Sequence, residues 1–595
     1  MTRSFRAPRF KPALFALALL PAMLACAGQE DGDGTARADA STAVQAAADQ
    51  AGTPNWTISG ALLAGRLAYD QGDDVMAAKL LGLARQAAPG DQVLAARTLS
   101  ALLSSGDFKA ATALAAEVKA QGAKTPFIGL VEMVDRVKAG DFKAAKVALE
   151  SISDDGIGRI AKPFFAAWIS LGIDGKLDPA LAAMAPLSDF NGLGPVVIQH
   201  TALMEDQMGR TQQAVDRMKG AADGGAASAR FIELYVEFLH RSGDDGDAKA
   251  FLDLFRSTNA GIAGAIADPL TERLAKPAVK GPILKTPAQG MAEAFFDLGS
   301  ILQSENVEDQ AKVFGRLALE LDPELDIARM LLGNIMQQRE RCAEAIDMYR
   351  SINADSIYRW SADISIADCQ QKLEDLDGAI ATLQGLVKAR PNRTEAVVEL
   401  GDLFRREKRF AEAVDAYSVV IDTIKEPTAS DWTLFYSRGV AHERNKQWEK
   451  AEPDFKKALE LSPDQPYALN YLAYTWVERR QNLDQALKML NNAVEQRPEE
   501  GFIVDSLGWA YFQLGEFEKA VTYLERAVEL QPTDPVLNDH LGDAYWRVGR
   551  KNEARFQWNR SLSFKPEDEQ ITIIQEKLKS GLGDAKAETT PPSGG

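Results

Sequence analysis

The stretch Gly508–Pro532, GWAYFQLGEFEKAVTYLERAVELQP, carries two helical patterns separated by Gly515. Apolar and small residues in its first half recur at spacings of three and four, which is the period of one helix face. Ala520, Leu524 and Ala527 repeat that spacing in the second half. Glycine favours a turn between the halves, and the final proline stops the second helix. The stretch therefore predicts a helical hairpin.

The same pattern recurs every thirty-four residues through the C-terminal half of the chain, with insertions of four and one. One column holds small residues: Gly299, Gly333, Ala367, Gly401, Gly439, Ala473, Gly508 and Gly542. A second column holds alanines: Ala311, Ala345, Ala379, Ala413, Ala451, Ala486, Ala520 and Ala554. A third, twelve residues after the alanine, holds prolines: Pro323, Pro391, Pro463, Pro498, Pro532 and Pro566. Eight consecutive hairpins with closely packed helices are expected.

This pattern resembles the tetratricopeptide repeat (TPR), and Gly508–Pro532 is close to the consensus of that family. The resemblance implies an all-α solenoid that winds as a right-handed superhelix. It also implies that the first helices of the hairpins line a concave groove, in which extended peptides or helices of partner proteins dock.

Divergent copies of the hairpin precede this array. Turn glycines fall at Gly72, Gly106, Gly140, Gly175, Gly209 and Gly243, each five residues before an alanine: Ala77, Ala111, Ala145, Ala180, Ala214 and Ala248. Six more hairpins are expected, which makes about fourteen in two arrays. They depart from the TPR pattern because Leu99, Met133, Trp168 and Val236 replace the small residue of the first helix.

The phase of the repeat breaks between the two arrays. Ala248 and Ala311 are 63 residues apart, which is no multiple of the period, and 257–290 contains four prolines. The expected organisation is a signal peptide (1–25), a lipidated flexible tether (26–56), a divergent TPR-like array (57–257), a linker or strap (258–290), a TPR array (291–568), a capping helix (569–583) and a disordered tail (584–595).

The N-terminus has the layout of a secretory signal peptide. Arg3, Arg6, Arg9 and Lys11 precede an apolar run that ends at Cys26. MLAC at its end resembles a bacterial lipobox, which implies lipidation of Cys26 and, with Ala27 next, a periplasm-facing outer-membrane lipoprotein. The alternative is a plain secretory signal and a soluble periplasmic protein.

Composition excludes several classes of function. The net charge is -18, from 85 acidic and 67 basic residues, and the only basic cluster is in the first eleven residues. Such a chain is a poor match to the phosphate backbone of nucleic acids. Neither a P-loop nor the second histidine of a zincin motif is present. We therefore expect no nucleic-acid partner, no cofactor and no metal site.

Two residue pairs invite a catalytic interpretation, Asp505 with Ser506 and Asp539 with His540. They are thirty-four residues apart, so they occupy one place in the repeat twice. Nothing in the sequence arranges a nucleophile, a base and an acid together. We expect a protein without enzymatic activity.

A second face of the first helices supplies the candidate partner-binding residues. At about 100° per residue, Asp505, Trp509 and Phe512 lie away from the hairpin seam. In the TPR family this face lines the groove. The matching positions, called here the second-face set, are Tyr436, Asn470, Tyr474, Asp505, Trp509, Phe512, Asp539, Asp543 and Trp546. The alternative is that these aromatic residues pack against neighbouring hairpins or the strap.

Cys342 and Cys369 are the remaining cysteines, in the turn of one hairpin and the first helix of the next. In an exported protein a pair of this kind favours a disulfide. Two buried thiols are the alternative.

The C-terminal array and the lipobox are similar to large TPR lipoproteins that bind carboxy-terminal processing proteases of the periplasm and present cell-wall hydrolases to them. This resemblance implies a protein-binding scaffold or adaptor of the bacterial cell envelope. The alternative function is a structural TPR lipoprotein of an envelope secretion or polysaccharide export complex.

Overall fold

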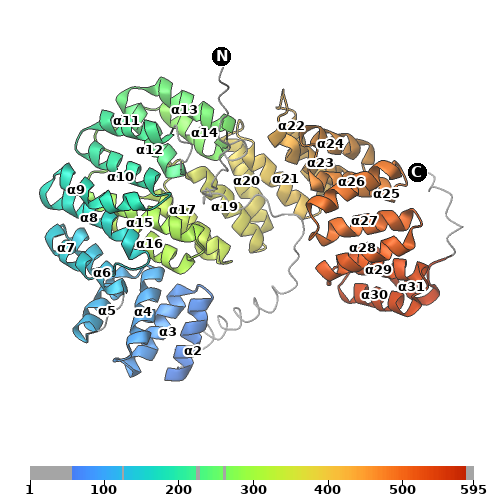
Figure 1. The fold of residues 1–595 in the computed structure, drawn as a ribbon, viewed down its shortest axis with the longest axis horizontal. Helices are drawn as coiled ribbons and strands as arrows, with labels where there is room; N and C mark the ends of the chain where they lie inside the picture. Colours follow the sequence, from blue (N-terminus) through green and yellow to red (C-terminus); the bar gives the residue numbers. More distant parts are fainter. Residues whose placement is uncertain (1–55, 123–125, 223–227, 259–262, 584–595) are drawn as a thin grey trace, which may run out of the picture. The chain divides into compact units, whose positions relative to one another are not determined.

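The computed structural model describes residues 56–122, 126–222, 228–258 and 263–583. These residues form thirty α-helices, α2 to α31, and two short 3-10 helices, with no strand among them (Figure 1). The expectation of an all-α TPR fold is confirmed. No helix in the described ranges is long and apolar enough to cross a lipid bilayer. The expected signal peptide, Cys26 with its tether as far as residue 55, and the tail from 584 lie outside the described residues.

The chain divides into two compact units, Met1–Leu386 and Val387–Gly595. The first six hairpins of unit 1 are α2 (Ile58–Asp70) and α3 (Asp74–Ala87), α4 (Gln92–Ser105) and α5 (Phe108–Ala120), α6 (Pro126–Lys138) and α7 (Phe142–Glu150), α8 (Gly158–Asp174) and α9 (Leu177–Met184), α10 (Gly194–Gln207) and α11 (Thr211–Ala222), and α12 (Ala229–Ser242) and α13 (Asp245–Thr258). The 3-10 helix η1 (Ala185–Asp189) follows α9.

Unit 1 continues with α14 (Ala263–Leu274), α15 (Pro287–Ser304), α16 (Glu308–Leu321), α17 (Asp326–Gln338), α18 (Cys342–Arg350), α19 (Arg359–Lys372) and most of α20 (Leu376–Ala389). Unit 2 contains α21 (Glu395–Arg406), α22 (Phe410–Ile421), η2 (Ala429–Asp431), α23 (Trp432–Arg444), α24 (Trp448–Leu461), α25 (Pro466–Glu478), α26 (Leu483–Gln496), α27 (Gly501–Gln513), α28 (Phe517–Leu530), α29 (Pro535–Arg547), α30 (Lys551–Ser563) and α31 (Asp568–Ser580).

Glycine–aspartate pairs explain the upstream turns. Gly106 ends α4 in the left-handed conformation, with φ of 87°, which costs glycine little. The next residue, Asp107, accepts a hydrogen bond from the backbone N–H of Ala110 at 3.0 Å and so caps α5. The pairs at 72–73 and 140–141 repeat this arrangement.

The alanine column marks the seam of every hairpin. All fourteen alanines of that column have no exposed surface, including the six in the divergent copies. The small residues opposite let the two helices approach. A Cβ at Gly333 would stand 2.4 Å from the ring of Tyr349, and one at Gly542 would stand 2.5 Å from the ring of Trp558. These glycines are therefore required by packing.

The hairpin of α15 and α16 packs against the divergent array. α15 contacts α8 and α10, while α16 contacts α4 and α6 (Figure 1). Gly290 lies against the ring of Trp168, and the rings of Phe165 and Phe295 are 4.5 Å apart between centroids. Large side chains on the divergent first helices thus pack on α15. The first compact unit accordingly includes the divergent array together with α15 and α16 and extends to Leu386.

Buried polar groups fix the position of α15. Glu293 accepts two hydrogen bonds from the guanidinium of Arg230 on α12. One turn along, Asp297 accepts from the side-chain amide of Gln199 at 2.9 Å and lies 3.1 Å from Nε2 of His200. Each charge is almost fully buried, so it depends on its partner for stabilisation.

The described part of segment 258–290 includes helix α14, which packs on α12 and α13. Beyond α14 the chain has no regular structure and runs over the divergent array. There the carbonyl of Lys276 lies 2.9 Å from Nε2 of His240, and the N–H of Ile283 donates to Asp206 at 2.8 Å. These two bonds attach the segment to α12 and α10.

Candidate partner-binding face

The second-face set comes from α23, α25, α27 and α29, the first helices of four successive hairpins in unit 2. α25 contacts α27 and α27 contacts α29, in addition to the contacts within each hairpin. The first helices therefore lie next to one another, and side chains on the second face of one helix reach those of the next.

Trp509 links three of these helices. Its ring stacks on Phe512 at 4.6 Å and on His540 of α29 at 4.0 Å between centroids, with interplanar angles of 6° and 12°. Its indole N–H donates to Glu478 at the end of α25. Only 9% of the residue remains exposed. Trp509 thus packs between hairpins.

His540 carries a positive charge in this stack. Burial favours the neutral imidazole, but the carboxylates of Asp505, Asp539 and Asp543 outweigh it and raise the pKa of His540 to about 9. Nδ1 lies 2.9 Å from Oδ2 of Asp505. The face of Trp509 is a favourable neighbour for the resulting cation. Asp505 and His540 therefore form a structural ion pair across two hairpins.

Two members of the second-face set on α29, Asp539 and Asp543, pair with a lysine of the last helix. Lys577 of α31 lies 2.7 Å from Asp539 and 2.8 Å from Asp543. Burial raises the pKa of Asp543 to about 6, although Lys577 opposes the shift. Asp543 also accepts from the indole N–H of Trp558 at 2.8 Å. The last position of the set is thus covered by α31.

Three oxygens in equivalent positions have no hydrogen-bond partner among the described residues. They are Oδ1 of Asn470, Oδ1 of Asp505 and Oδ1 of Asp539, one in each of α25, α27 and α29. All three residues are more than nine-tenths buried. The oxygens themselves have almost no accessible surface, so they belong to the packing between the three helices and a partner does not touch them.

The set divides into two groups by exposure. Five members are buried: Asn470, Asp505, Trp509, Asp539 and Asp543. Four are half-buried: Tyr436, Tyr474, Phe512 and Trp546. Trp546 packs on Trp558 and against Gly581 beyond α31. The exposed edges of Tyr436, Tyr474 and Phe512 are therefore the parts of the set best placed to meet a partner.

The two residue pairs considered for catalysis have structural partners. The hydroxyl of Ser506 donates to the carbonyl of Phe502 in its own helix at 2.9 Å. His540 pairs with Asp505, as described above. The described residues contain no group of three or more His, Cys, Asp or Glu side chains arranged to hold a metal ion.

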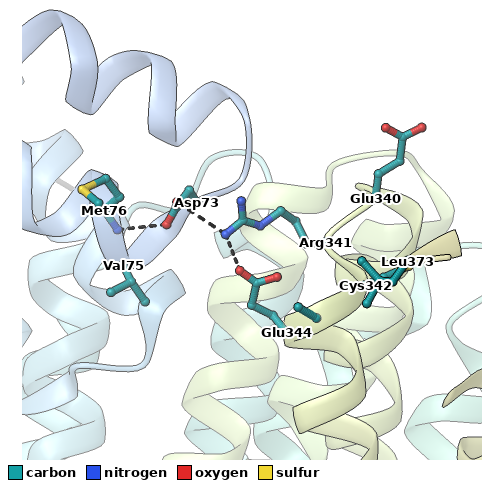
Figure 2. A pocket seen from close by; sticks show the side chains of 9 residues that line it. Asp73, Val75, Met76, Glu340, Arg341, Cys342, Glu344 and Leu373 are labelled. Atoms are coloured by element: carbon teal, nitrogen blue, oxygen red, sulfur yellow. Dashed lines mark hydrogen bonds and ion pairs between the residues drawn. The ribbon is translucent and has the colours of Figure 1, made fainter. Parts of the chain in front are cut away.

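Unit 1 also contains a pocket that the sequence does not predict. A pocket of about 420 Å³ lies between the turn that leads into α3 and the turn that joins α17 to α18 (Figure 2). Asp73, Val75 and Met76 line one side, and residues 340–344 with Leu373 line the other. Arg341 connects the sides, because it lies 3.5 Å from Asp73 and also pairs with Glu344. The sequence gives no signal of it, since the two turns are far apart in the chain.

Cys342 lies in the wall of this pocket, and Cys369 lies on α19 and does not line it. Both are free thiols and both are buried. The pocket therefore brings one member of the cysteine pair next to solvent-accessible space.

Three family models match the chain in its C-terminal part. A TPR repeat model covers 508–549, and two tetratricopeptide repeat models cover 432–465 and 366–427. These segments are tetratricopeptide repeats. Among curated proteins, the TPR repeat-containing protein PA4667 of Pseudomonas aeruginosa is 26% identical over 198 residues, and the BBSome complex member BBS4 of Bos taurus is 32% identical over 91 residues. The first match spans about a third of each chain, and the second spans 15% of this chain and 17% of its relative.

Solved structures similar to the chain include the following two. A tetratricopeptide repeat protein from Parabacteroides merdae is 15% identical, with a TM-score of 0.32, over 48% of this chain and 97% of its own. A chain of the APC/C hetero-tetramer Cut9-Hcn1 is 14% identical, with a TM-score of 0.36, over 88% of this chain and 96% of its own.

Proposed function

We propose that this protein is a non-enzymatic adaptor of the bacterial cell envelope and that it binds partner proteins on the second face of α23, α25 and α27. Its TPR hairpins indicate a protein-binding scaffold in general terms. The observation that carries the proposal is the line of half-buried aromatic side chains Tyr436, Tyr474 and Phe512, one on each of these three first helices.

The chemistry of the face indicates what the partner supplies. Aromatic edges on these three helices provide apolar contact area, which is typical of interface anchors. We therefore expect a partner segment with apolar side chains. An acidic partner terminus is disfavoured by the carboxylates of Asp505, Asp539 and Asp543.

The test is an affinity purification from cross-linked envelope extracts, read by mass spectrometry. The variant combines Tyr436→Ala and Phe512→Ala. The control is Phe556→Ala, because Phe556 is 61% exposed on α30 and is not part of the set. Circular dichroism first shows that all three chains fold alike.

We expect a periplasmic protease or cell-wall hydrolases with the wild type and the control, and their loss with the double variant. Recovery of the same partners with all three chains would exclude this face. Recovery of secretin or export components in place of enzymes would support the structural lipoprotein of an export complex instead.

The envelope location rests on the sequence of the first twenty-seven residues, outside the described residues. We propose that Cys26 is lipidated and holds the protein at the outer membrane. Cys26→Ser should move the protein from the membrane fraction to the soluble periplasmic fraction. Unchanged membrane association of that variant would argue against the anchor.

A further inference from the structure

The two free thiols of unit 1 are neighbours in space. Cys342 is the first residue of α18, and Cys369 lies near the end of α19, twenty-seven residues later. The two helices pack together, and each thiol is close enough to shift the pKa of the other. A disulfide needs Cα atoms no more than about 7 Å apart, a separation that residues on packed neighbouring helices reach.

The surroundings of the two thiols differ. Interaction with the Cys369 thiol lowers the pKa of Cys342; burial opposes this and Lys372 adds to it. Asp368 and Glu340 are the acidic groups nearby, and they act in the opposite direction. Interaction with Cys342 and burial raise the pKa of Cys369. Cys342 also stands in the first turn of a helix, where backbone N–H groups favour a thiolate.

The two thiols also differ in their access to the pocket, and this difference again favours reaction at Cys342. Cys342 contributes to the wall of the pocket in Figure 2, whereas Cys369 does not line it and has no exposed surface. A reagent that enters between Asp73 and Glu344 therefore meets Cys342 first. The thiol with the more stable thiolate is also the one that the pocket reaches.

We propose that Cys342 and Cys369 form a thiol–disulfide exchange site, at which a small disulfide such as oxidised glutathione enters the pocket and reacts with Cys342 first. The Cys342 thiolate attacks one sulfur of the small disulfide, so that a mixed disulfide forms and one glutathione thiolate leaves. The Cys369 thiol then loses its proton, and its thiolate attacks the Cys342 sulfur. The second glutathione leaves as a thiolate and takes up that proton. The two protein thiols are oxidised to one disulfide, and one oxidised glutathione is reduced to two thiols.

This site is separate from the partner-binding face, because it lies in unit 1 and uses none of its residues. Its product ties the start of α18 to the end of α19 and thereby fixes the hairpin turn that carries Arg341. The inference therefore survives if the proposed function fails.

The test uses the full chain with Cys26→Ser, which leaves these two thiols as the only cysteines. The folded protein is treated with oxidised glutathione, quenched in acid, and analysed by intact and peptide mass spectrometry. We expect loss of both thiols to an internal bridge. With Cys369→Ser we expect a stable glutathione adduct on Cys342, and with Cys342→Ser an adduct on Cys369 that forms at least about tenfold more slowly. Equal rates in the two variants would overturn the order of reaction.

Two further measurements do not alter either cysteine. Native alkylation should label Cys342 before Cys369. Val75→Trp, which adds bulk to the pocket wall, should slow oxidation, whereas Val93→Trp should not; both valines are exposed, but only Val75 lines the pocket. Labelling of Cys369 first, oxidation unaffected by Val75→Trp, or no internal bridge at any excess of oxidised glutathione would each contradict the proposal.

Discussion

Gly333→Ala should destabilise unit 1, although alanine is the better helix former. The added Cβ would stand 2.4 Å from the nearest ring atom of Tyr349, well inside contact distance. Tyr349 cannot swing away, because it is fully buried and its hydroxyl lies 2.7 Å from side-chain oxygens of Asn334 and Gln337. Overpacking costs about 1–3 kcal/mol, and a ring held at both ends belongs at the upper end. Alanine gains about 1 kcal/mol over glycine within a helix, which leaves a net loss of about 1–2 kcal/mol.

A glycine-to-alanine substitution at a site without crowding separates the effect of overpacking from the effect of helix propensity. Gly385 lies inside α20, and a Cβ there meets no heavy atom of the described residues within 4 Å. Gly385→Ala should therefore stabilise unit 1 by about 1 kcal/mol, through helix propensity alone. Urea unfolding of the full chain, followed by far-ultraviolet circular dichroism, gives the midpoint for each variant. If Gly333→Ala unfolds at the same urea concentration as the wild type or higher, while Gly385→Ala behaves as expected, the packing explanation of the small-residue column is wrong.

Three more substitutions test the buried charges. The raised pKa of His540 means that its charge stabilises unit 2 by about 3 kcal/mol below pH 6.5 and that this contribution disappears as the pH rises through about 9. The difference between the urea midpoints measured below pH 6.5 and above pH 9 should therefore be smaller in His540→Gln than in the wild type. If the variant keeps the pH dependence of the wild type, the ion pair is not its cause. Lys577→Met should release α31 and speed proteolysis within 568–583, whereas Lys579→Met on the exposed end of that helix should not. Glu293→Ala removes one carboxylate partner of the buried Arg230 guanidinium and should lower the free energy of unfolding of unit 1 by about 3–5 kcal/mol, measured by urea unfolding. A decrease of less than about 1 kcal/mol would show that water reaches the guanidinium.

The hairpins could be predicted from sequence because a thirty-four-residue period is a local signal. Each hairpin needs a small residue where its helices meet and a turn residue between them, and both recur in register. That is why the alanine column, from Ala77 to Ala554, is buried without exception. All six divergent copies kept this column, whereas only Gly65 and Ala202 remain of the small-residue column and only Pro89 of the proline column.

The packing of α15 against the divergent array could not be predicted in the same way. The ion pair of Arg230 with Glu293 joins residues 63 apart, and no period connects them. A clue is present in the sequence, since Glu293 and Asp297 interrupt an otherwise apolar helix one turn apart. Two acids on such a face indicate buried partners, but they do not identify Arg230 and Gln199.

The second-face set shows a different limit. Helix geometry places Trp509 away from its own hairpin seam, but it does not tell whether the neighbouring hairpin covers that face. His540 covers it here, and its stacking on Trp509 depends on the spacing of α27 and α29. The row of unpaired oxygens is likewise visible only when the hydrogen bonds of all three helices are known.

The packing of α15 and α16 on the divergent array has a consequence for how the chain folds. In a simple repeat stack each hairpin needs only the one before it, so folding can proceed as the chain emerges. Here Trp168 and Phe165 of α8 pack in part on Gly290 and Phe295, which come about 120 residues later in the chain. Until then a large apolar surface of the first six hairpins is exposed, which is when a chain is most prone to aggregate or to need a chaperone. A fragment that ends near residue 257 should therefore be poorly soluble, and unit 1 should fold as one late, cooperative step.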